Sequence, residues 1–158
     1  MTDLFSLMGR TALVTGGSRG IGRMIAAGFL AQGARVYISS RKADACDQAA
    51  AELSESGACI SLPADVSSVE GARKLVKAYA THESKLDILV NNAGAAWGAP
   101  FDEFPEKGWD KVVDLNLKMP FFLTQALVGH LRIAAATAPA KVINIASIDG
   151  ISVNMQET

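Results

Sequence analysis

The sequence predicts an α/β fold with a doubly wound parallel sheet, and two observations carry that prediction. Short apolar runs of strand length alternate with longer helical segments along the chain. The apolar runs lack the polar alternation of a half-exposed strand, which is typical of strands covered by helices on both faces. Right-handed crossovers between such strands produce a parallel sheet that binds ligands at the carboxyl ends of its strands.

The predicted strands and helices alternate strictly. Strands are expected at residues 11–15, 35–39, 59–62, 86–90 and 141–145. Helices are expected at residues 21–32 and 43–56, each followed by glycine, then from 67 or 68 to about 82, and from about 106 to 136. Residues 1–158 are therefore interpreted as one domain. If the sheet ended at the fifth strand, that strand would be an apolar edge without cover. The sheet is therefore interpreted as truncated after the fifth strand.

Composition and charge argue against several classes of function. The chain has 158 residues and a formal net charge of −1 with scattered Lys and Arg, so we expect no nucleic-acid partner. The amino terminus has no signal-peptide pattern, and the apolar segment 119–138 is interrupted by polar residues, so we expect no membrane association. The two cysteines have no CxxC spacing, which favours a reduced, cytoplasmic setting. The two histidines lack metal-ligand spacing, and no metal is expected.

The junction between the first strand and the first helix is rich in glycine. It reads Thr15-Gly16-Gly17-Ser18-Arg19-Gly20-Ile21-Gly22. Bare glycine backbone lets anionic oxygens approach the free N–H groups of the first helical turn, where the helix dipole is positive. The junction therefore predicts a Rossmann-type dinucleotide site, although a glycine turn without a ligand would give the same pattern. The expected cofactor contacts here are Gly16, Ser18, Arg19, Gly20, Ile21 and Gly22.

The residues after the second strand indicate which dinucleotide binds. A carboxylate at this place binds the ribose hydroxyls of NAD, whereas arginine suits the 2′-phosphate of NADP. The sequence reads Ser39-Ser40-Arg41-Lys42, with no acid. Arg41 and Arg19 supply two guanidinium groups whose bidentate geometry matches a phosphate. NADPH is therefore favoured over NADH, the alternative for Arg41 being a solvated helix start.

Polar and small residues follow the third and fourth strands. Asp65, in Asp65-Val66, is placed to accept the adenine amino group, but a helix-capping role is an equal alternative. Asn91, Asn92, Ala93 and Gly94 close the fourth strand. Their small side chains and amides are suited to line the cofactor and to brace the sheet, and an ordinary Asn-rich turn is the alternative.

Two further residues are candidates for chemistry. Asn116 lies within the long predicted helix, where Asn is a poor helix former. It is either a surface residue or a residue that bends the helix and holds a water near the active site. Ser147 follows the fifth strand, on the expected ligand side of the sheet, where its hydroxyl could bind a substrate carbonyl. A solvated loop serine is the alternative, and no His/Asp partner indicates a nucleophile.

Taken together, these residues resemble the short-chain dehydrogenase/reductase superfamily over essentially the whole chain. The matching segments, in order, are residues 15–22, Asp65-Val66, residues 91–94, Asn116, and residues 143–147. Within the superfamily the sequence is similar to bacterial 3-oxoacyl-acyl-carrier-protein reductases. It is especially similar to the type that serves rhamnolipid biosynthesis, because of Phe5-Ser6-Leu7 and Ala95-Ala96-Trp97-Gly98.

The resemblance implies that NADPH supplies a hydride to a ketone carbon while a tyrosine donates the proton. It also implies that Ser147 polarises the carbonyl, that Asn116 anchors a relay water, and that the protein is a tetramer or dimer built partly through the long helix. The Tyr-x-x-x-Lys pair of the superfamily has no counterpart here. We therefore expect the chain to be the amino-terminal part of a longer enzyme and inactive by itself, the alternative being a non-catalytic dinucleotide-binding module.

Overall fold

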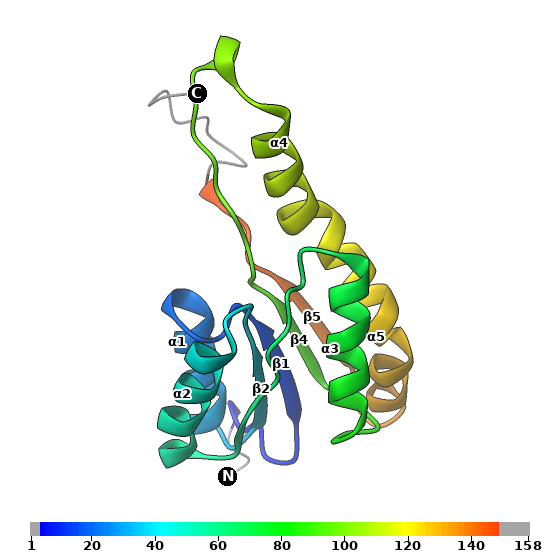
Figure 1. The fold of residues 1–158 in the computed structure, drawn as a ribbon. Helices are drawn as coiled ribbons and strands as arrows, with labels where there is room; N and C mark the ends of the chain where they lie inside the picture. The colour runs from blue at the N-terminus through cyan, green and yellow to red at the C-terminus, as the bar shows by residue number, and fades with distance from the viewer. Residues whose placement is uncertain (1–3, 149–158) are drawn as a thin grey trace.

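The computed structural model describes residues 4–148, which form a parallel sheet between two layers of helices (Figure 1). The strand order is β3-β2-β1-β4-β5, with every neighbouring pair parallel. The strands are β1 (Thr11–Thr15), β2 (Arg35–Ser39), β3 (Cys59–Ser61), β4 (Ile88–Asn91) and β5 (Lys141–Asn144). The order reverses direction between β1 and β4, which is the switch point of a doubly wound sheet. The predicted fold class is confirmed.

Alternate residues of the central strands face opposite helical layers. Ala12 and Val14 of β1 pack in one core with helices α1 (Gly20–Ala31) and α2 (Ala43–Leu53). Leu13 lies between them and packs in the other core with helices α3 (Val69–Ala80) and α5 (Met119–Ala135). All five residues of β1 are buried. The strand therefore has no polar face, as its uninterrupted apolar pattern predicts.

The long helix expected at residues 106–136 is correct in extent but is interrupted. It consists of α4 (Glu106–Val113), a π-helical turn η3 (Asp114–Lys118) and α5. In Figure 1, α4 extends past the sheet at the end where the strands end. A π turn widens the helix by one residue and commonly occurs at functional sites. Asn116 is the central residue of η3, so the interruption coincides with a residue of low helix propensity.

Several element boundaries differ from the prediction by one to three residues. Helix α2 ends at Leu53, and a short 3-10 turn, η1 (Ser54–Ser56), completes the segment expected to be helical. Strand β4 begins at Ile88 rather than at residue 86, although the Asp87 backbone still donates to the Thr11 carbonyl oxygen and accepts from the Lys141 N–H. A second 3-10 turn, η2 (Phe101–Glu103), precedes α4.

Strand β5 forms one edge of the sheet within residues 4–148. Each of its residues is exposed, including Val142 at 42% and Ile143 at 40%. These apolar side chains agree with the prediction of an uncovered apolar edge strand.

Candidate active site

The glycine junction forms a close-packed turn between β1 and α1. Gly16 and Gly20 have positive φ angles of 67° and 54°, a region that side chains with a Cβ disfavour. A methyl group added to Gly22 would overlap the Gly16 carbonyl oxygen and the Asn92 amide. Arg19 is the N-cap residue of α1 and makes no capping hydrogen bond, and the first turn of α1 has no acidic residue. The N–H groups of this turn are therefore not covered by a side-chain cap, and the residues present fit a pyrophosphate.

A hydroxyl and an amide join this turn to the end of β4. The Thr15 hydroxyl donates to the Val90 carbonyl oxygen at 3.2 Å and accepts from the backbone N–H groups of Asn92 and Ala93, both at 3.0 Å. The Asn92 amide donates to the carbonyl oxygens of Thr15 at 2.9 Å and Gly16 at 3.3 Å. The expectation that asparagine amides brace the sheet here is confirmed. Thr15 was not among the predicted site residues, although a polar residue ending an apolar strand was a signal for it.

Asn91 joins β4 to β5 on the same edge. Its side-chain amide donates to the Asn144 side-chain oxygen at 2.8 Å and to the Thr124 hydroxyl at 3.3 Å. The Ile145 N–H donates to the Asn91 carbonyl oxygen at 3.0 Å, which continues the β4–β5 pairing beyond Asn144. Ser147 is exposed and comes two residues later. The structure therefore places Ser147 at the same edge of the sheet as the glycine turn and Asn92.

Asn116 binds the segment that leaves β4. Its Oδ1 accepts from the Ala95 N–H and its Nδ2 donates to the Ala95 carbonyl oxygen, both at 2.8 Å. Gly94 lies beside it, since a methyl group on Gly94 would be 3.3 Å from the same Oδ1. Asn116 is exposed, as the surface alternative predicts, and it lies in the π turn that interrupts the helix. The role of the side chain in holding a water stays a prediction.

Two of the residues expected to bind the adenosine end, Asp65 and Arg41, lie on neighbouring segments. The Ala64 N–H donates to the Ser40 carbonyl oxygen at 3.0 Å, which brings Asp65 close to Arg41. Arg19 and Arg41 are both exposed, and neither forms an ion pair with an acid among residues 4–148. Two unpaired guanidinium groups are what a phosphate site requires.

Asp65 and Val66 take different structural roles. The Asp65 Oδ1 accepts from the Ser67 N–H at 3.0 Å, a local turn contact. The helix is capped by Ser68, whose hydroxyl accepts from the Gly71 N–H at 3.1 Å. The capping alternative for Asp65 is therefore wrong, because the helix begins at Val69, four residues after Asp65, and Ser68 occupies the N-cap. The Val66 side chain is buried in the core, so only its backbone is available to a ligand.

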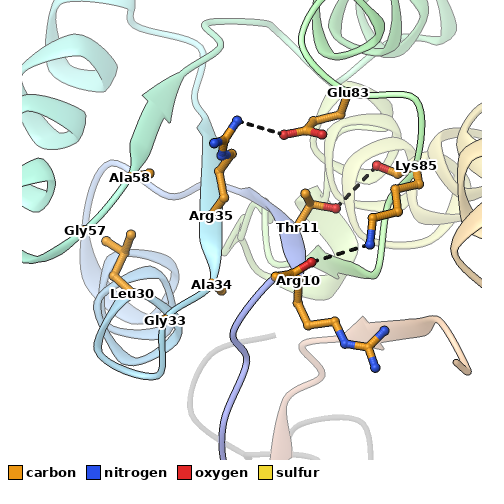
Figure 2. A pocket seen from close by; sticks show the side chains of 11 residues that line it. Arg10, Thr11, Leu30, Gly33, Ala34, Arg35, Gly57, Ala58, Glu83 and Lys85 are labelled. Atoms are coloured by element: carbon orange, nitrogen blue, oxygen red, sulfur yellow. Dashed lines mark hydrogen bonds and ion pairs between the residues drawn. The ribbon is translucent and has the colours of Figure 1, made fainter. Parts of the chain in front are cut away.

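A separate cavity of about 450 Å³ lies at the opposite end of the sheet, where the strands begin. Figure 2 shows Arg35 from β2 pointing toward Glu83, with Lys85 and Thr11 on the far side. None of the predicted site residues lines it. The buried Asp87 lies next to it and accepts from Arg10 at 2.8 Å and from the Thr11 N–H at 3.0 Å. Burial opposes ionisation of Asp87, but these hydrogen bonds and Lys85 lower its pKa to about 2.

Two features are absent from residues 4–148. No group of three or more His, Cys, Asp or Glu side chains in this range is arranged to hold a metal ion. No helix in the same range is long and apolar enough to cross a bilayer.

The fold and the site together define a doubly wound α/β protein with a nucleotide-type glycine turn at its switch point. The sequence model of the short chain dehydrogenase family matches residues 10–157. The chain belongs to the short-chain dehydrogenase family, as the motifs of residues 15–22 and 91–94 indicate.

Individual relatives agree with this assignment. The chain is 54% identical over 153 residues to the rhamnolipids biosynthesis 3-oxoacyl-[acyl-carrier-protein] reductase of Pseudomonas aeruginosa, covering 96% of this chain and 60% of the relative. It is 37% identical over 147 residues to gluconate 5-dehydrogenase of Gluconobacter oxydans, covering 92% of this chain and 56% of that enzyme. Thus the chain spans less than two thirds of the length of either relative.

Solved structures show the same fold. The Pseudomonas aeruginosa RhlG/NADP active-site complex superposes with a TM-score of 0.95 at 51% identity, covering 99% of this chain and 62% of that one. L-sorbose reductase from Gluconobacter frateurii, in complex with NADPH and L-sorbose, superposes with a TM-score of 0.89 at 29% identity, covering 97% of this chain and 58% of that one.

Proposed function

We propose that this chain is the cofactor-binding part of an NADPH-dependent reductase that converts a 3-oxoacyl group to the 3-hydroxy compound. The observation that carries the proposal is the gathering of the glycine turn, Asn92, Asn116 and Ser147 at the carboxyl edge of one sheet. The 54% identity to the Pseudomonas aeruginosa 3-oxoacyl reductase supports the substrate class. NADPH supplies the hydride in such a reaction.

The residues of the chain divide between the two ends of the cofactor. The uncapped first turn of α1, with Gly16, Gly20 and Gly22, binds the pyrophosphate. Arg19 and Arg41 bind the 2′-phosphate, since both are exposed and unpaired within the described range. The remaining predicted residues contact three parts of the cofactor. Ser18 and Ile21 lie at the helix start beside the pyrophosphate, and Asp65 and the Val66 backbone contact the adenine. Along the ribose and nicotinamide, the contacts are made by Asn92, Ala93 and Gly94.

Two residues act on the substrate side. The Ser147 hydroxyl donates a hydrogen bond to the substrate carbonyl oxygen and so stabilises the charge that develops there during reduction. Asn116 holds the segment after β4 through Ala95 and anchors a relay water. The printed sequence contains no Tyr-x-x-x-Lys pair, and the proton donor is assigned to none of its residues.

Cofactor choice is tested by changing Arg41 to Asp in the full-length protein. The change removes a charge-assisted phosphate contact and adds a repelling carboxylate, so NADPH binding weakens by about 1.5–3 kcal/mol while NADH binding changes much less. Titration of cofactor fluorescence measures both affinities. Arg23→Ala is the matched control, because Arg23 is a half-exposed arginine of α1 that pairs with Glu52. Equal losses for both cofactors in Arg41→Asp would remove Arg41 from the phosphate site.

The reaction is tested with an acetoacetyl thioester. The full-length protein oxidises NADPH with this substrate, and Ser147→Ala lowers kcat by about 10²-fold with unchanged NADPH affinity, since one oxyanion donor is lost. Binding of NADPH without oxidation by any 3-oxoacyl thioester would instead support a non-catalytic dinucleotide-binding module.

Two wider assignments complete the proposal. Exposed apolar side chains along the long helix, Trp109 at 63%, Leu117 at 71% and Phe121 at 63%, support a homo-oligomer formed through it. Phe121→Glu is then expected to reduce the mass measured by light scattering.

A cytoplasmic setting is supported by Cys46 and Cys59, which are free thiols. Burial, together with the neighbouring Cys46, raises the pKa of Cys59 to about 11.

A further inference from the structure

Residues 93–99 leave the carboxyl end of β4 and run toward α4 without regular secondary structure (Figure 1). Among the described residues, their backbone groups form no hydrogen bond with the backbone of another segment. Side chains therefore fix their position. The Thr15 hydroxyl binds the Ala93 N–H, and the Asn116 amide binds both backbone groups of Ala95.

Trp97 provides a third attachment, to helix α4. Gly108 is the third residue of α4 and is buried. A methyl group built on Gly108 would lie 2.7–2.8 Å from three atoms of the Trp97 indole, so the ring covers the Gly108 backbone directly. Lys111, one turn further along α4, places its ammonium 5.1 Å from the ring centroid, within the range of a cation–π interaction. Trp97 is only 36% exposed although it lies in a loop.

We propose that Trp97 is a positioning residue of the reductase site, an inference that rests on the proposed function. The indole on Gly108 fixes the far end of residues 93–97, while Thr15 fixes the near end. The Ala95–Asn116 pair and Gly94 lie between these two attachments. Cofactor contacts at the end of β4 and the π turn that carries Asn116 are thereby held in one fixed relation. Gly108 is needed at its position because any side chain there displaces the indole.

The contact itself is tested by a thermal-stability cycle that does not depend on activity. Gly108→Ala is expected to lower Tm in the presence of Trp97, because the methyl group and the ring cannot occupy the same space. In the Trp97→Ala background the same change is expected to raise Tm, because Ala is a better helix former than Gly. Gly28→Ala in α1 is the matched control, since nothing lies within 4 Å of its added methyl group, and it should raise Tm in both backgrounds. A Gly108→Ala effect of the same sign in both backgrounds would overturn the contact.

Tryptophan emission gives a second readout of the contact. The sequence contains two tryptophans, so Trp109→Phe leaves Trp97 as the sole emitter. In that background Gly108→Ala should shift the emission maximum to longer wavelength, because the displaced indole enters water, while Gly28→Ala should not. An unchanged maximum would contradict the proposed packing.

The positioning role is tested by kinetics in the full-length protein. Trp97→Ala should lower kcat with an acetoacetyl thioester about tenfold or more, since small misplacements of a site are costly, while NADPH affinity stays within about twofold. Trp97→Phe, which keeps an aromatic ring, should recover most of the loss. An unchanged kcat, or an equal loss of kcat and NADPH affinity, would overturn the positioning role. If the wild-type protein reduces no 3-oxoacyl thioester, the proposed function fails and the positioning role with it, while the stability cycle separately decides the contact.

Discussion

The buried carboxylate of Asp87 gives a prediction whose size follows from the structure. Its side chain is 2% exposed and lies between Arg10 at 2.8 Å and Lys85 at 3.1 Å, each of which is 34% exposed. Burial opposes ionisation, but hydrogen bonds from Arg10, the Thr11 N–H and Lys85 outweigh it and lower the pKa from 3.8 to about 2. One pKa unit corresponds to about 1.4 kcal/mol, so ionised Asp87 contributes about 2 kcal/mol to folding at pH 7.

The sign of the pH dependence follows from the direction of this shift. The pKa of Asp87 is lower in the folded state, so its contribution is present above the unfolded value of 3.8 and is lost as pH falls toward about 2. Asp87→Asn keeps the shape of the side chain and removes its charge. The stability difference between wild type and Asp87→Asn should be about 2 kcal/mol at pH 7 and at pH 5, about 1 kcal/mol at pH 3, and close to zero at pH 2.

Urea unfolding of both proteins at these pH values measures the difference. Asp47→Asn is the matched control, because Asp47 is an exposed carboxylate of α2 and its replacement should cost less than about 0.5 kcal/mol at every pH. A wild-type minus Asp87→Asn difference that stays constant from pH 7 to pH 3 would contradict a charge-dependent contribution of Asp87. It would mean that Asp87 acts through packing or neutral hydrogen bonds and not through its charge.

Three further outcomes are expected. Thr15→Val leaves two partly buried backbone N–H groups without their acceptor and should lower the free energy of unfolding by about 1–3 kcal/mol, measured by urea denaturation. A neutral effect would show that water replaces the hydroxyl. Gly22→Ala should lower stability by about 1–3 kcal/mol through overlap with the Gly16 carbonyl, whereas Gly28→Ala, which meets open space, should raise Tm in thermal melts. Ser68→Ala removes the N-cap of α3 and should cost about 1 kcal/mol in the same melts, and a cost near zero would mean that another group caps the helix.

Local patterns predicted most elements because each pattern has a local cause. The apolar run of β1 and the glycine turn after it lie where expected, since a strand buried on both faces and a helix start each leave a mark in adjacent residues. The start of α3 was expected at residue 67 or 68, close to its observed start at Val69. Only the backbone conformation shows that the Ser68 hydroxyl accepts from the Gly71 N–H and so caps the helix.

The residues that the sequence could not resolve depend on partners far along the chain. Asn116 had two possible structural roles until Ala95, 21 residues away, was found to bind its amide. Thr15 was missed because its acceptors and donors are 75 to 78 residues away. The packing of Trp97 on Gly108 could not be predicted from adjacent residues, because a tryptophan in a loop and a glycine in a helix each occur in many structural settings.

The class of fold, the glycine turn with its neighbouring arginines, and the family could all be inferred from the sequence. These depend on short-range periodicity, turn chemistry and charge, which adjacent residues specify directly. How Thr15, Asn92, Asn116 and Trp97 are joined is visible only in the folded structure. Side-chain hydrogen bonds and ring contacts between distant segments depend on where packing of the two cores brings those segments, and no short stretch of sequence contains that information.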